Sequence, residues 1–184
     1  MEHLNGRDVT SVSLTTGGGL AEGGVVRGRF TIRCVRGDEE LWSDTADNLI
    51  VNQGKNALLD AGLAGSAWTA AYYLSLITAG AAIATSTYAV PTVTEVAAGV
   101  LANRIALGWT VAANGAKAST TTSCAIVGSA TITGAMVVSG GSGVTTPGNT
   151  AATGGVLFSA GTFTGGNKIV SSGDTLNVSY SVSV

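Results

Sequence analysis

The sequence is poor in charged side chains, and most of them lie near its beginning. Its 184 residues include 9 Lys and Arg, 11 Asp and Glu and one histidine, for a formal net charge of −2. Only a few charged residues follow Asp60, namely Glu95, Arg104, Lys117, Lys168 and Asp174. Proteins that bind nucleic acid through their overall field are basic, so we expect no nucleic-acid partner. Any function that uses charge is expected in the first 60 residues.

Groups for acid–base and nucleophilic catalysis are equally scarce. His3 is the only histidine, so a triad, general base or metal cage built on histidine is not available. Glu95 and Asp174 would have to come together from distant positions to act as a carboxylate pair. The glycine runs GGGLAEGG and GGSG lack the lysine and the Ser or Thr of a phosphate-binding loop. We therefore expect no enzymatic activity, no catalytic residues, and no metal or cofactor.

Cysteine, proline and long apolar segments are also rare. Cys34 and Cys124 are too far apart in sequence for a metal motif, so we expect two reduced, unbridged thiols. The uncharged run from Ala61 to Thr94 is dominated by small residues and contains Pro91. No Lys/Arg cluster flanks this run, so we do not expect it to span a membrane. The N-terminal sequence MEHLNGRDVT lacks the features of a signal peptide.

Glycine, threonine and valine are abundant, and they are arranged in short segments. Residues 106–111, 123–127, 130–138, 155–163 and 175–184 read as strands separated by clusters of Gly, Ser, Thr and Asn. This spacing is typical of an antiparallel sandwich or barrel. We predict an all-β fold, an antiparallel β-sandwich of jelly-roll-like type, with one short helix over residues 52–62. Residues 93–101 are expected to be irregular or weakly helical.

The chain is expected to form one domain over residues 25–184, preceded by a flexible N-terminal arm over residues 1–24. The arm is rich in glycine, and within it residues 9–14, VTSVSL, suggest a short strand. Residues 139–155 read as a surface loop. The large side chains expected to be buried are Phe30, Ile32, Trp42, Leu58, Tyr73, Leu76, Trp109, Ile126, Ile132, Phe158, Leu176, Val178 and Tyr180.

The stretch VVRGRFTIRCVRGDEELWSDT, residues 25–45, predicts a hairpin with a row of arginines. Strict alternation places Arg27, Arg29 and Arg33 on one face and the apolar residues between them on the other. The row has two interpretations. The arginines can pair across the hairpin with Glu40, Asp44 or their neighbours, or they can bind a partner. The tripeptide Arg36-Gly37-Asp38 matches a cell-adhesion motif, but we interpret it as a hairpin turn.

Four blocks of the sequence resemble virion structural proteins of tailed bacteriophages. In chain order they are GRFTIRCVRGDEELWSDTADNLIVNQGKNALLD, AGSAWTAAYYLSLI, SATITGAMVVS and GGVLFSAGTFTGGNKIVSSGDTLNVSYSVSV, spanning roughly residues 28–184. The resemblance implies a role in virion assembly and supplies no catalytic residues. In similar sequences the segment after the second block is often richer in His, Trp and charge than TAGAAIATSTYAVPTVTEVAAGV is here.

Two roles are compatible with this resemblance. One is a capsid cement or decoration protein on the outer surface of the capsid, made in the bacterial cytoplasm, with the major capsid protein and copies of itself (a dimer or trimer) as partners. The other is a tail- or fibre-associated protein of host attachment. The chain has no internal repeat and only 5% aromatic residues, which favours the first role. The expected attachment residues are Arg27, Arg29 and Arg33, together with Val9, Val12 and Leu14 of the arm, which can add a strand to a neighbouring protein.

Overall fold

The computed structural model describes residues 26–63, 71–141, 143–148 and 154–184. The predicted N-terminal arm, with Val9, Val12 and Leu14, lies outside these residues. Within them the chain forms one helix and twelve strands: β1 (Arg27–Arg36), β2 (Glu39–Ile50), α1 (Asn52–Leu63), β3 (Tyr72–Gly80), β4 (Val93–Glu95), β5 (Ile105–Ala106), β6 (Ala116–Ala118), β7 (Thr122–Ala125), β8 (Ala130–Ile132), β9 (Gly134–Gly140), β10 (Gly155–Thr162), β11 (Lys168–Val170) and β12 (Thr175–Ser183).

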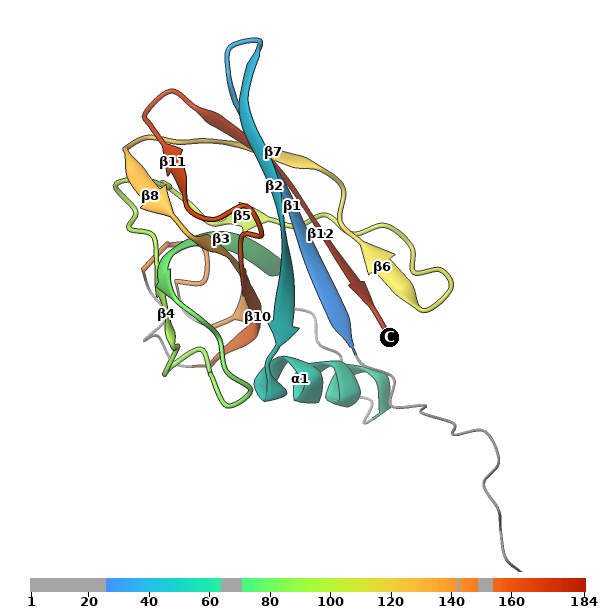
Figure 1. Ribbon diagram of the computed structural model, residues 1–184. Coiled ribbons are helices and arrows are strands. Elements are labelled where there is room, and N and C mark those ends of the chain that lie inside the picture. The colour runs from blue at the N-terminus through green and yellow to red at the C-terminus, as the bar shows by residue number, and fades with distance from the viewer. Residues whose placement is uncertain (1–25, 64–70, 142, 149–153) are drawn as a thin grey trace, which may run out of the picture.

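Ten of the strands form two antiparallel layers that meet at β2, and β8 and β11 pair in a separate two-stranded sheet (Figure 1). Strand β2 pairs with β1 along most of its length, whereas its last residues, Leu49 and Ile50, pair with β10. One layer therefore contains β2, β1 and β12, with β6 and β7 paired to β12. The other contains β10, β9 and β3, with β4 and β5 paired to β3. This arrangement confirms the predicted all-β sandwich with one short helix.

The core fills the space between the two layers. Strands β1 and β12 alternate buried and exposed residues over most of their length, as the sequence pattern predicted. Their inward side chains, such as Phe30 and Tyr180, pack against residues of the other layer, such as Leu76 and Phe158. Burial of each large apolar side chain stabilises the fold by about 1.5–3 kcal/mol. The residues of the predicted core that are buried are Phe30, Ile32, Leu76, Ile126, Ile132, Phe158, Leu176, Val178 and Tyr180.

The remaining four residues of the predicted core are not fully buried. Trp42, Tyr73 and Trp109 are only half-buried. The prediction for Leu58 was wrong, since it is 36% exposed. The reason is the close packing of α1 on β10, in which a Cβ on Gly54 would overlap the carbonyl oxygen of Phe158. A helix this close to the sheet buries small side chains, and its leucines point outward.

Several segments differ from their predicted structure. Residues 130–138, expected to be one strand, are divided into β8 and β9, which belong to different sheets. Residues 93–101, expected to be irregular or weakly helical, begin with the short strand β4 and continue in turns. Residues 106–111, expected to be a strand, contain only the end of β5 and an isolated bridge from Trp109 to Ser119. The Gly108 carbonyl accepts a hydrogen bond from the N–H of Thr120, and the Thr110 N–H donates to the Ala118 carbonyl, so this segment lies beside the end of β6 without forming a strand.

The two cysteines are free thiols. Cys34 on β1 and Cys124 on β7 are both direct neighbours of Leu176 on β12, from opposite sides. Two strand spacings separate their Cα atoms by roughly 9–10 Å, whereas a disulfide requires no more than about 6.8 Å. Burial raises the pKa of each thiol to about 11. The register therefore explains why the thiols are not bridged.

Candidate functional site

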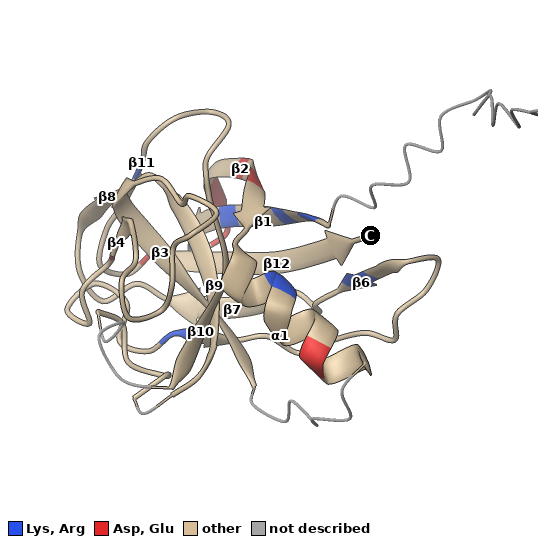
Figure 2. Cartoon of the chain, turned by 90° about the horizontal axis from the view of Figure 1, so that it is seen from below, with Lys and Arg blue, Asp and Glu red and all other residues tan. Residues whose placement is uncertain are grey.

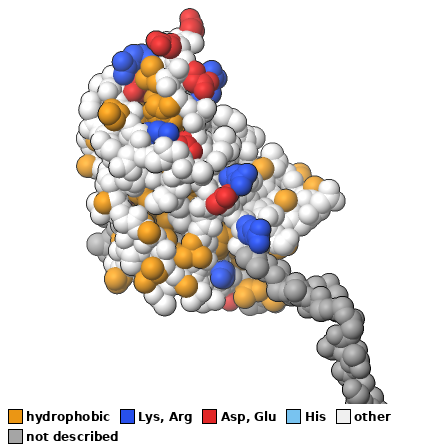
Figure 3. All heavy atoms as spheres, in the orientation of Figure 1, with side chains coloured by type: hydrophobic (Ala, Val, Ile, Leu, Met, Phe, Trp, Pro, Cys, Tyr) orange, Lys and Arg blue, Asp and Glu red, His pale blue; other side chains and the backbone are white. Residues whose placement is uncertain are grey.

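The exposed face of the β2–β1–β12 layer carries the arginine row, Arg27, Arg29 and Arg33. All three side chains point away from the core, which confirms the predicted alternation. The register places Ser183 beside Arg27, Ser181 beside Arg29, and further Ser, Thr and Asn residues along the rest of the row. Charged side chains also gather over the β1–β2 hairpin (Figure 3). The result is a polar sheet face whose largest side chains are arginines.

Two of the three arginines are paired within the hairpin. Arg29 donates to both carboxylate oxygens of Asp47, with Nε–Oδ1 at 2.6 Å and Nη2–Oδ2 at 3.2 Å. Arg33 donates to Glu40, as the hairpin interpretation predicted. Asp44, the other predicted partner, instead binds the Lys168 ammonium group at 2.9 Å. Arg27 makes no hydrogen bond or ion pair with the described residues, so its guanidinium is the one member of the row without a partner there.

These pairs keep their carboxylates ionised but leave them accessible. The hydrogen bond from Arg29 lowers the pKa of Asp47, and the nearby charge of Arg27 lowers it further. The hydrogen bond from Arg33 lowers the pKa of Glu40 in the same way. The side chains of Arg29 and Asp47 are 58% and 72% exposed. Because exposed pairs contribute little to stability, a carboxylate from another protein can compete for these arginines.

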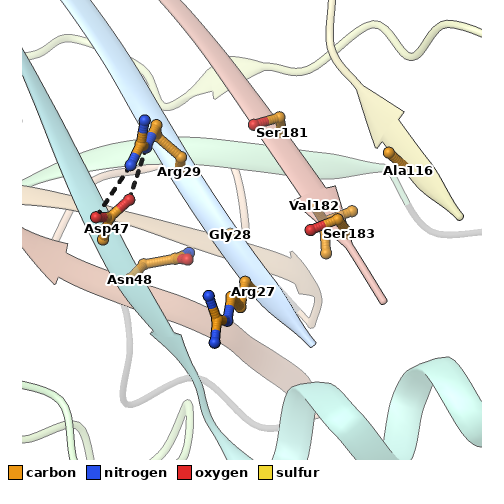
Figure 4. A pocket seen from close by; sticks show the side chains of 9 residues that line it. All are labelled: Arg27, Gly28, Arg29, Asp47, Asn48, Ala116, Ser181, Val182 and Ser183. Carbon is orange, nitrogen blue, oxygen red and sulfur yellow. Dashed lines mark hydrogen bonds and ion pairs between the residues drawn. The ribbon is translucent and has the colours of Figure 1, made fainter. Parts of the chain in front are cut away.

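A hollow of about 570 Å³ lies at the beginning of β1, next to Arg27 and Arg29 (Figure 4). Asp47 and Asn48 of β2 and the end of β12 complete its wall. Asn48 Nδ2 donates a hydrogen bond to the Tyr180 hydroxyl at 2.9 Å. This pair lies against Gly28, where a Cβ atom would overlap both groups. The Asn48 Oδ1 atom is buried and accepts no hydrogen bond in the described part of the chain. Among the charged side chains that line the hollow, Arg27 is the one without a hydrogen bond or ion pair to the described residues, since Arg29 and Asp47 bind each other.

The tripeptide Arg36-Gly37-Asp38 forms the tip of the β1–β2 hairpin, and Gly37 has a φ of 58° there. Arg36 Nε donates to Asp174 Oδ1 at 2.8 Å, and the Asp174 side chain is only 1% exposed. Burial alone would raise the pKa of Asp174, but hydrogen bonds from Arg36 and from the N–H of Ser171 lower it overall. The arginine of the tripeptide is therefore engaged in holding the hairpin to the sheet.

A buried ion pair, which the sequence pattern did not reveal, lies at the edge of the second layer. Arg104 donates to both oxygens of Glu95, at 2.6 and 2.7 Å, and to the Tyr88 hydroxyl at 2.9 Å. It also donates to the Val144 carbonyl, while Glu95 accepts from the N–H of Gly148. These contacts tie β4 to two loops. The only signal in the sequence was an isolated arginine in a nearly uncharged region.

In the part of the chain that the structure describes, no group of three or more His, Cys, Asp or Glu side chains could hold a metal ion. No described helix has the length and apolar character to cross a membrane. Comparison with protein-family models, curated proteins and solved structures finds no match to this chain. The candidate site of the described residues is the arginine row with the adjoining hollow.

Proposed function

We propose that this protein is a structural component of a tailed-bacteriophage virion, a decoration protein that binds the outer surface of the major capsid protein shell and stabilises it. The proposal rests on the resemblance of four sequence blocks to virion structural proteins and on the arginine row. It assigns no catalysis and no cofactor, and it names neither nucleic acid nor a membrane as a partner. The protein would be made in the bacterial cytoplasm and act on the capsid surface as a homo-oligomer.

The observation that carries the proposal is the exposed guanidinium of Arg27 beside the hollow at the start of β1. Arginine binds carboxylates bidentately and remains charged at every physiological pH, so it suits attachment to acidic groups on an assembled shell. The flat sheet face around the row provides a broad surface for the same contact. The N-terminal arm joins the domain at this end of β1, so Val9, Val12 and Leu14 could add a strand to a capsid edge close to the arginine contact.

We predict that replacements in the arginine row weaken capsid binding to different degrees. Replacing Arg27 with serine should weaken binding to purified capsids by about tenfold or more, because it removes a cation that has no partner within the described domain. Replacing Arg29 should weaken binding less, because part of its interaction energy is already realised with Asp47. The triple replacement of Arg27, Arg29 and Arg33, or removal of residues 1–22, should abolish occupancy at moderate salt. Cosedimentation with capsids that lack the protein measures each effect.

The matched control for the loss of one positive charge is Lys55→Ser, which changes an exposed cation on α1 that is not part of the row. This variant should bind capsids as the wild type does. Wild-type occupancy by both the triple variant and the truncated chain would mean that the attachment surface lies elsewhere. Binding to isolated tails instead of capsids would favour the tail- or fibre-associated role.

A further inference from the structure

Three exposed leucines, Leu58, Leu59 and Leu63, lie at one end of the sandwich. Helix α1, which carries them, lies across this end (Figure 1 and Figure 2). The helix buries only Gly54 and Ala57. Leu59 and Leu63, one turn apart on its outer side, are 57% and 83% exposed. Because residues four apart lie on one face of a helix, these two leucines form an apolar ridge.

An apolar groove of about 440 Å³ lies next to this ridge. Aromatic side chains form much of its wall, since the Tyr72 ring meets Trp109 and Phe158 edge-on at centroid distances of 5.9 and 5.4 Å. The rest of the apolar lining comes from Leu58, Ala71, Leu107 and Val182. Lys117, an exposed cation, places its Nζ 5.9 Å from the centre of the Trp109 ring. Among the described residues it is the only charged group that lines the groove.

The ridge and the groove are both apolar, and each adjoins a charged residue of opposite sign. The ridge presents two leucines, which fit a groove of aromatic and aliphatic side chains. Asp60 follows Leu59 directly and makes no hydrogen bond or ion pair with the described residues, so it offers a free carboxylate beside the ridge. The groove offers the Lys117 ammonium group. A contiguous exposed apolar surface of this kind, rimmed by polar groups, marks an interaction site.

We propose that this end of the molecule is a two-fold dimer interface between copies of this chain. The α1 ridge of each copy enters the groove of the other, and Asp60 of each copy faces Lys117 of the other. In a two-fold dimer each contact occurs twice, because both copies use the same surface. Neither Asp60 nor Lys117 belongs to the arginine row, and the inference does not depend on the proposed capsid role.

Charge reversal tests this interface with the full-length chain. Asp60→Lys and Lys117→Asp should each weaken dimerisation by about tenfold or more, because each places like charges at both symmetric contacts. Mixing the two variants should restore the dimer, since both contacts in the mixed pair again join opposite charges. The double variant should also dimerise. Analytical ultracentrifugation across a concentration series measures each association constant.

Asp38→Lys, at the exposed hairpin tip, makes the same change of charge away from the interface and should dimerise as the wild type does. Leu59→Asp should be monomeric, because it buries a carboxylate in the apolar groove. A near-ultraviolet circular dichroism spectrum identical to the wild type would show that each variant is folded. The proposal is overturned if the wild-type chain is monomeric at high micromolar concentration, if both single reversals dimerise normally, or if their mixture remains monomeric.

Discussion

Replacing Arg104 with methionine should lower the free energy of unfolding by about 3–5 kcal/mol, because it leaves a buried carboxylate without its cation. The side chains of Arg104 and Glu95 are 0% and 3% exposed, so water cannot replace the lost guanidinium. The Tyr88 hydroxyl and the Val144 carbonyl would lose their donor as well. Chemical denaturation of the wild type and the variant measures the difference.

Two variants separate the cost of an unpaired charge from the loss of side-chain packing. The double replacement of Glu95 and Arg104 by methionine should recover much of the stability, because a buried pair replaced by apolar residues is often tolerated. Arg29→Met removes a similar bidentate ion pair from the exposed face and should leave the unfolding midpoint unchanged. An equal loss of stability in the Arg104 and Arg29 variants would contradict this account of the buried pair.

Replacing Phe158 with alanine should also destabilise the protein strongly, by about 3–5 kcal/mol. Phe158 is 2% exposed and its ring lies edge-on to Tyr72 and Tyr180, at centroid distances of 5.4 and 6.3 Å. The strand that carries it also supports α1, since the Phe158 carbonyl accepts a hydrogen bond from the N–H of Val51. The alanine variant leaves a cavity that surrounding strands cannot fill without moving.

The same denaturation measurement tests this second prediction. Ile169→Ala is the control, because Ile169 is an apolar strand residue that is 70% exposed. Its removal should change the free energy of unfolding by no more than about 0.5 kcal/mol. A Phe158→Ala variant as stable as the Ile169→Ala variant would mean that Phe158 does not lie in the core.

Local patterns predicted much of the fold. In β1 and β12 apolar and polar residues alternate over most of the strand, and the predicted faces are those observed. Helix α1 begins at Asn52, as predicted, but its orientation depends on how closely Gly54 approaches β10. The local sequence does not show how closely the helix packs on the strand, so the exposure of Leu58 was not predicted. Strand β3 was also missed, because residues buried on both faces do not alternate.

The candidate site, like the fold, was predicted only in part from local sequence patterns. The alternation of β1 predicted that Arg27, Arg29 and Arg33 share one face. Which of these arginines lacks an ion-pair partner depends on the register with β2, where Asp47 lies opposite Arg29. The buried pair of Glu95 and Arg104 depends on the path of two loops and on strand pairing. A short stretch of sequence predicts neither of these. Their contact could be known only from the folded chain.

The central claim is that the protein decorates the capsid shell, and its copy number on separated heads and tails tests that claim most directly. Quantitative mass spectrometry of purified particles, with the major capsid protein as internal reference, gives this number for each fraction. We predict that the protein copurifies with heads, at a number that scales with the major capsid protein, and that tailless heads retain all of it. A protein present in only a few copies, and found with the tails, would contradict the account.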